Sequence, residues 1–117
     1  MIKNIKKIRS NLFNSLNGLK ESLNEHSFIS EIILGILLIP ILIFIEIDNF
    51  MTLLIILTYF LLLAFELINT SIEKLSDKIN KDYDLDIKNI KDISSAAVFI
   101  ILILLIALII YSVFLLS

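Results

Sequence analysis

Four polar residues follow one another at the end of a long apolar run in this sequence. Glu66, Asn69, Glu73 and Asp77 are separated by three, four and four positions, which places them on one stripe of an α-helix. Fifteen uncharged residues, 51–65, precede them. An ionisable residue inside a membrane-spanning helix is costly, so we expect it to serve a function. Mg²⁺ prefers oxygen ligands such as carboxylates, particularly when it carries nucleotide phosphates. Carboxylates that face the cytoplasm could therefore bind it.

The composition indicates that the surrounding elements lie in a membrane. Of the 117 residues, 58% are apolar and the mean hydropathy is +0.96, more than a soluble domain of this size carries. We expect one all-α membrane domain over 1–117, with a surface helix over 1–27 and membrane-spanning helices over 28–47, 51–73 and 93–116. The third span, at roughly 36 Å, is long enough to cross with some tilt.

The first segment differs from the three spans because it is amphipathic. Isoleucine and leucine recur at intervals of three and four over 2–23, while basic residues fill the other faces, which is typical of a helix lying in the membrane surface. A helix packed on a soluble partner is the alternative. Lysines are concentrated near the N-terminus and in the link 74–92, whereas the link 46–50 has none. This distribution predicts a cytoplasmic N-terminus and second link, and an external Ser117.

Several common catalytic arrangements are missing from the sequence. The chain has no cysteine and only two glycines, and it contains neither G-x-x-x-x-G-K-[ST] nor G-x-G-x-x-G. The single histidine, His26, is expected at the membrane interface, so Ser-His-Asp catalysis is not predicted. If ATP binds, its phosphates must be held by Mg²⁺ and side chains.

Taken together, these residues resemble the signature of prokaryotic diacylglycerol kinases. The resemblance rests on the run Glu66-Leu-Ile-Asn-Thr-Ser-Ile-Glu73, on Asp77, on Lys91-Asp92 with Ser95-Ala96-Ala97, and on the junction 24–31. It covers nearly the whole chain. It implies a homotrimeric, multi-pass lipid kinase of the bacterial cytoplasmic membrane, which transfers the γ-phosphoryl group of MgATP to a lipid hydroxyl. No nucleic acid is expected as a partner.

The resemblance also implies a role for each polar residue. Glu66 would be the general base at the lipid hydroxyl, with Asn69 and Asp77 supporting it, and Glu25 and Glu73 would bind Mg²⁺. Contacts to the nucleotide are expected from Lys6, Glu25, Glu73, Asp82, Tyr83, Asp84, Lys91 and Asp92, and contacts to the lipid from Glu31, Glu66 and Ser95.

The sequence departs from the family pattern at two places. Where many members have arginine near the N-terminus, this chain offers Lys6, Lys7 or Arg9, of which we take Lys6 as the ATP contact. Asn89 stands where the family often carries arginine, which would alter nucleotide affinity.

The lipid and the function class each have alternatives. Diacylglycerol is the expected lipid because Glu31 resembles that branch of the family more than the undecaprenol kinase branch. Outside the family, a small transporter or a structural membrane subunit would also place a glutamate in a span. A transporter would need that acid nearer the middle of the membrane, and a structural subunit would tolerate its replacement by glutamine.

Overall fold

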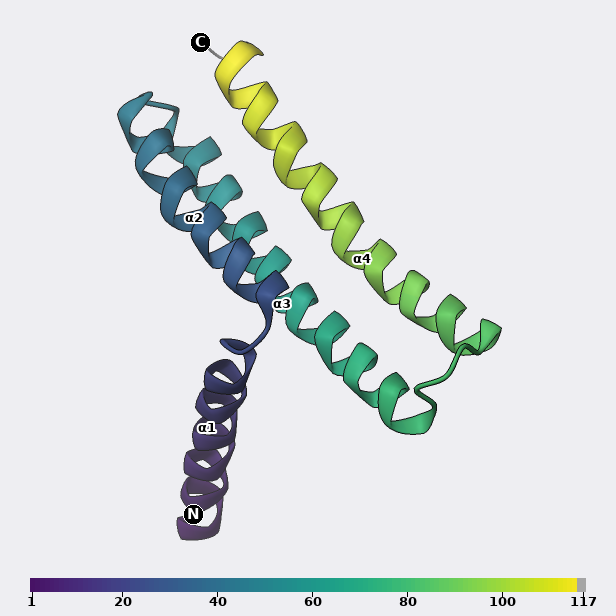
Figure 1. Cartoon of the computed structure of the whole chain (residues 1–117). Coiled ribbons are helices and arrows are strands. Elements are labelled where there is room, and N and C mark those ends of the chain that lie inside the picture. Colours follow the sequence, from purple (N-terminus) through teal and green to yellow (C-terminus); the bar gives the residue numbers. More distant parts are fainter. Residues whose placement is uncertain (116–117) are drawn as a thin grey trace.

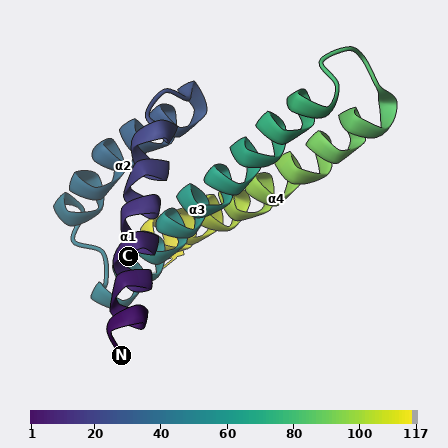
Figure 2. The same cartoon turned by 90° about the horizontal axis from the view of Figure 1, so that it is seen from below.

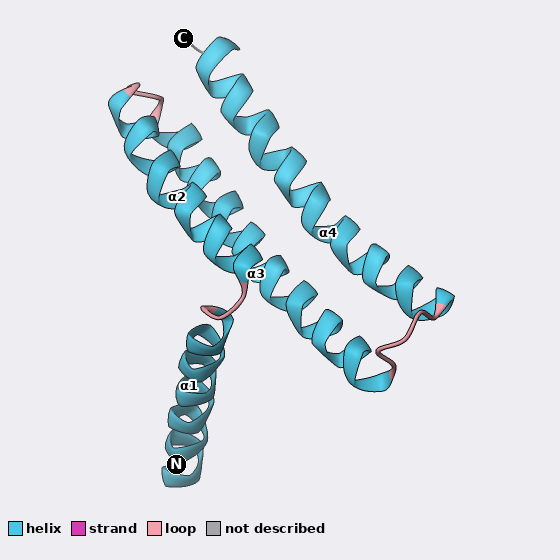
Figure 3. Ribbon diagram, in the orientation of Figure 1, coloured by secondary structure: helices cyan, strands magenta, loops and turns pink. Residues whose placement is uncertain are grey.

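The computed structural model describes residues 1–115. They form four α-helices, α1 (Ile2–Ser22), α2 (His26–Phe44), α3 (Asn49–Ile79) and α4 (Leu85–Ile110), and a short π-helical segment, η1 (Tyr111–Leu115), that continues α4. No strand occurs within these residues (Figure 3). The predicted all-α fold is therefore confirmed. Position 116, the last of the third expected span, and Ser117 lie outside the described residues.

Short connections with polar caps set the helix ends. The side chain of Asp48 accepts hydrogen bonds from the backbone N–H groups of Phe50 and Met51 at 3.1 and 3.2 Å, and caps α3. Asp84 caps α4 by accepting a bond of 3.0 Å from the N–H of Ile87. Such caps satisfy donors that have no partner within the helix. At the end of α2 the turn places Glu46 at a φ of 57°, in the left-handed region that few non-glycine residues adopt.

Three helices are long and apolar enough to cross a membrane, as the sequence predicted. They are α2, α3 and the continuous helix Leu85–Phe114 formed by α4 and η1. The 31 residues of α3 extend over about 46 Å, which exceeds the ~30 Å hydrocarbon layer of a bilayer. Helix α3 continues to Ile79, well past the expected span 51–73, so it is long enough to extend beyond an apolar layer of that thickness without a break.

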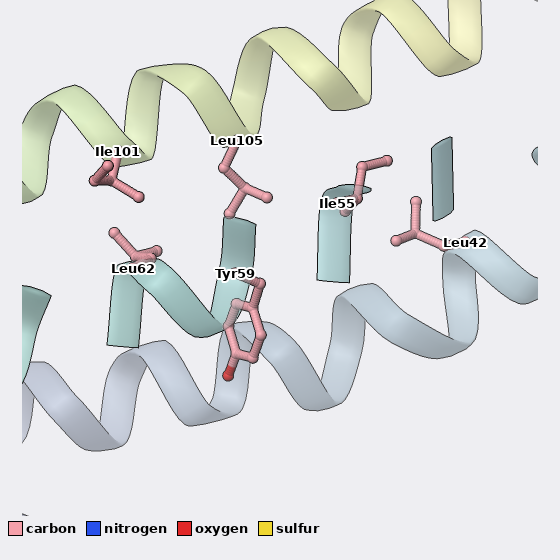
Figure 4. Packing of buried hydrophobic residues seen from close by; sticks show 6 residues of the cluster. All are labelled: Leu42, Ile55, Tyr59, Leu62, Ile101 and Leu105. Carbon is pink, nitrogen blue, oxygen red and sulfur yellow. The ribbon is translucent and has the colours of Figure 1, made fainter. Parts of the chain in front are cut away.

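Helix α3 packs on both α2 and α4, and the rotated view shows α3 and α4 side by side along their length (Figure 2). The buried core between the three helices consists of Leu42, Ile55, Tyr59, Leu62, Ile101 and Leu105 (Figure 4). Helix α1 diverges from this bundle at the α1–α2 connection (Figure 1). Its apolar residues remain exposed, as expected for a helix whose partner is a membrane surface.

Candidate active site

The polar stripe on α3 continues the buried face of the same helix. Tyr59 and Leu62 belong to the core, and Glu66 and Asn69 follow them at helical spacing. Glu66 is 5% exposed and Asn69 is 7% exposed, so both side chains lie inside the bundle. Glu73, one turn further along, is exposed. The stripe thus passes from the protein interior to the surface in the direction of the α3–α4 connection.

Asn69 connects the buried and the exposed parts of the stripe. Its Nδ2 donates a hydrogen bond of 3.3 Å to Oε1 of Glu73. Its Oδ1 is buried and has no hydrogen-bond partner among the described residues. Buried acceptors in folded proteins nearly always have a partner, so one that lacks it requires an explanation such as a bound water, ion or ligand. Asn69 is therefore suited to receive a ligand group between the two glutamates.

A second carboxylate approaches the stripe from α2. Glu31 is half-buried, and its carboxylate lies close enough to Glu66 for the two negative charges to repel each other. Its Oε2 is also buried without a hydrogen-bond partner in residues 1–115. We call the following four residues the carboxylate cluster: Glu31, Glu66, Asn69 and Glu73. It offers acceptor oxygens that the described part of the protein leaves unsatisfied.

A pocket of about 540 Å³ lies between α1 and the same part of α3. It is lined by Ser15, Gly18, Leu19, Glu21, Ser22, Glu25, Leu67, Thr70, Ser71 and Lys74. Lys74 donates to Oε1 of Glu25 at 2.6 Å, which joins the α1–α2 connection to α3. Both side chains are partly exposed, so the pair adds little stability by itself. It does place Glu25 against the turn of α3 that carries Glu73.

A second pocket, of about 450 Å³, lies at the α3–α4 connection. Its lining consists of Asp77, Asn80, Lys81, Asp82, Tyr83, Asp84, Ile87, Lys88, Lys91 and Asp92. Lys91 forms an ion pair with Asp77 of α3, and Lys88 pairs with Asp92 at 2.6 Å. The connection therefore gathers lysines, acids and a tyrosine within reach of one ligand.

Comparison with known protein families decides what this arrangement belongs to. Residues 13–114 match the family described as prokaryotic diacylglycerol kinase, a range that includes the carboxylate cluster and both pockets. The chain belongs to the prokaryotic diacylglycerol kinase family. No curated protein matches it. The resemblance inferred from the sequence is thereby confirmed, and membership in this family indicates a lipid kinase held in a membrane.

The structure gathers most of the residues that the family resemblance implicates, in two places. Glu31, Glu66, Asn69 and Glu73 form the carboxylate cluster, with Glu25 in the neighbouring pocket. The other group lines the pocket at the α3–α4 connection and consists of Asp77, Asp82, Tyr83, Asp84, Lys91 and Asp92.

Two expected site residues of this family member lie elsewhere. Lys6 is on α1, beside Arg9 and Phe13 in a third pocket, and precedes the residues that match the family. Ser95 is exposed on α4 and lines none of these pockets. Lys74, the partner of Glu25, was not expected among the site residues. The sequence gives no signal for the pairing of Lys74 with Glu25, because the two residues lie on segments that are distant in the sequence.

The residues present fit a nucleotide-bound Mg²⁺ ion. Within residues 1–115, no three histidine, cysteine or acidic side chains converge as a metal site. A magnesium ion on a nucleotide usually takes only one or two carboxylates from the protein, together with phosphate oxygens and water. Glu73 can supply one such carboxylate, and Glu25 lies against Lys74, the residue that follows Glu73 on α3.

Proposed function

We propose that this chain transfers the γ-phosphoryl group of ATP to the free hydroxyl of diacylglycerol, forming phosphatidic acid at the cytoplasmic face of the membrane. The observation that carries the proposal is the burial of Glu66 and Asn69 on the core face of α3 in a member of a lipid kinase family. Glu66 is fifteen residues from Met51, about 22 Å along the helix. That position corresponds to the depth of a lipid's glycerol and ester groups.

In this proposal, Glu66 is the general base. Its carboxylate accepts the proton of the lipid hydroxyl while the hydroxyl oxygen forms a bond to the γ-phosphorus, and the bond from that phosphorus to the β–γ bridging oxygen breaks to release ADP. The hydroxyl has a single proton, which it donates to Glu66, so Asn69 and Glu31 contribute by lining the acceptor site beside Glu66 with buried polar oxygens. Proton removal by a positioned base typically contributes a factor of about 10² to 10⁴ in rate.

The nucleotide is assigned to the surface-exposed end of the carboxylate cluster, toward the α3–α4 connection. The pocket at the α3–α4 connection offers Asp82, Tyr83, Lys91 and their neighbours, and Glu25 and Glu73 would hold Mg²⁺. When bound, Mg²⁺ neutralises charge on the phosphates. Lys91, held by Asp77, supplies a positive group toward the same phosphates. Phosphoryl transfer depends mainly on positioning and charge neutralisation, and these side chains provide both.

The proposed membrane orientation places both polar segments in the cytoplasm, where ATP is available. Lysines in α1 and in the α3–α4 connection support this orientation, because positive charge is enriched on cytoplasmic loops. A homotrimer is proposed as the working unit, as the family resemblance implies. The large exposed apolar residues of α2, α3 and α4 provide surface for both lipid and neighbouring subunits.

The lipid assignment predicts a measurable preference. In mixed micelles containing equal mole fractions of diacylglycerol and undecaprenol, labelled ATP should transfer phosphate to diacylglycerol at least severalfold faster. Acyl chains anchor the acceptor along the helices and supply the binding energy that positions its hydroxyl. Water-soluble glycerol, which lacks this anchoring, should be a very poor acceptor.

The outcomes of this assay separate the competing functions. A preference for undecaprenol would overturn the lipid assignment and leave the kinase chemistry in place. If neither lipid is labelled by protein that is folded and reconstituted with Mg²⁺, the kinase proposal is wrong. A role for Glu66 in a small transporter or in a structural membrane subunit would then be favoured.

A further inference from the structure

A tyrosine two turns deeper in the bundle holds α2 against α3. The hydroxyl of Tyr59 donates a hydrogen bond of 2.8 Å to the backbone carbonyl of Glu31. Figure 4 shows the ring extending from α3 with its oxygen at the ribbon of α2. The ring occupies space that only glycine leaves open, because a Cβ at Gly35 would lie 2.1 Å from the Tyr59 hydroxyl oxygen and 2.2 Å from its ring. Tyr59, Gly35 and the Glu31 carbonyl will be called the tyrosine contact.

The tyrosine contact is aligned with the carboxylate cluster. Tyr59 and Glu66 are seven residues apart on the buried face of α3, about 10 Å along the helix axis. Glu31 lies one turn before Gly35 on α2. Helical side chains tilt toward the N-terminus of their own helix. Because α2 and α3 are antiparallel (Figure 1), the carboxylate of Glu31 extends from the tyrosine contact in the direction of Glu66, with which it interacts.

A hydroxyl is not needed to fill this part of the core. Leu42, Ile55, Leu62 and Leu105 around it are fully buried and apolar, and a phenylalanine ring would bury the same apolar surface. The hydroxyl adds a directional bond to one particular carbonyl, and the bond fixes the height of α2 relative to α3. That carbonyl belongs to Glu31, whose carboxylate is close enough to Glu66 for their charges to interact.

We propose that Tyr59 is a positioning residue for the lipid acceptor. Its hydroxyl, seated in the space at Gly35, fixes the turn of α2 that holds the Glu31 carboxylate next to Glu66, and so determines how tightly the acceptor hydroxyl is bound. This inference rests on the proposed function, since it assigns Glu31 to the lipid. The nucleotide, on the far side of Glu73, should be unaffected.

Kinetics of the protein in diacylglycerol micelles test the proposal. Tyr59→Phe should raise KM for the lipid by about two- to tenfold, the range expected for loss of one hydrogen bond, and leave KM for MgATP unchanged. Tyr111→Phe, which removes a hydroxyl from an exposed tyrosine of η1, should change neither. Gly35→Ala should raise the lipid KM further, because the added Cβ displaces the ring. An unchanged lipid KM in Tyr59→Phe, or a parallel change in both KM values, would overturn the proposal.

A measurement that needs no turnover separates this inference from the proposed function. In protein with ¹³C-labelled glutamate carboxyl groups, the Glu31 signal can be assigned by its loss in Glu31→Gln. Tyr59→Phe should shift this signal, whereas Tyr111→Phe should not. A Glu31 signal that is identical in Tyr59→Phe and wild type refutes the positioning role whether or not the protein phosphorylates lipid. Wild-type protein without lipid kinase activity refutes the proposed function alone.

Discussion

Replacing Glu66 with glutamine should lower the rate of lipid phosphorylation by about 10²- to 10⁴-fold, the usual contribution of a positioned general base. Glutamine preserves the shape of this buried side chain, which is 5% exposed, but its amide cannot accept the hydroxyl proton. The measurement is phosphate transfer from labelled ATP to diacylglycerol in mixed micelles, at saturating concentrations of both substrates. The elution volume of the purified variant in size-exclusion chromatography should match that of wild type.

The matched control for this prediction is Glu46→Gln. Glu46 is an exposed glutamate at the end of α2, on the side of the bundle opposite the carboxylate cluster, and its replacement should leave the rate unchanged. Activity of Glu66→Gln within a few-fold of wild type would contradict the general-base assignment. It would also agree with Glu66 acting as a polar contact between helices.

Glu73→Asp should produce a defect of a different kind. The substitution withdraws the carboxylate by one methylene group from the position where it accepts a bond from Asn69 at 3.3 Å. Because Mg²⁺ requires near-ideal octahedral geometry, the Mg²⁺ concentration for half-maximal activity should rise by about tenfold or more. The maximal rate should also fall. Titration of activity with Mg²⁺ at a fixed ATP concentration measures both quantities.

Glu46→Asp shortens a glutamate outside the site and should leave the Mg²⁺ titration unchanged. If Glu73→Asp lowers the rate while its Mg²⁺ dependence matches that of wild type, Glu73 does not contribute a metal ligand. The link between Asn69 and Glu73 would then serve only to orient Asn69.

The fold was largely predictable because its signals are local. Long apolar runs predicted the three helices that are long and apolar enough to span a membrane, and steps of three and four residues placed Glu66, Asn69 and Glu73 on one helical face. The end of α3 was harder to place. The sequence marks where the apolar run stops, but a helix that leaves the apolar layer can continue with polar side chains, as α3 does to Ile79.

The contacts between helices could not be read from the sequence. Periodicity shows which residues share a face of one helix, but not which residue of another helix faces them. The pairs Glu25–Lys74 and Asp77–Lys91 join different elements and have no distinctive spacing. The contact of Tyr59 with Gly35 was equally hidden, because a tyrosine within an apolar run is expected simply as a core residue.

The length of α3 has a consequence for how the two substrates would meet. Between Glu66 and Asp77 the helix contains neither glycine nor proline, so about 16 Å of uninterrupted rod joins the residue proposed for the lipid to the pocket proposed for the nucleotide. The spacing between the acceptor site and the nucleotide pocket is then built into a single rigid element and does not depend on the closing of a loop. What remains adjustable is the bilayer, because a thicker membrane would submerge Glu66 and a thinner one would lift it out of reach of the hydroxyl. The rate of lipid phosphorylation would therefore depend on membrane thickness.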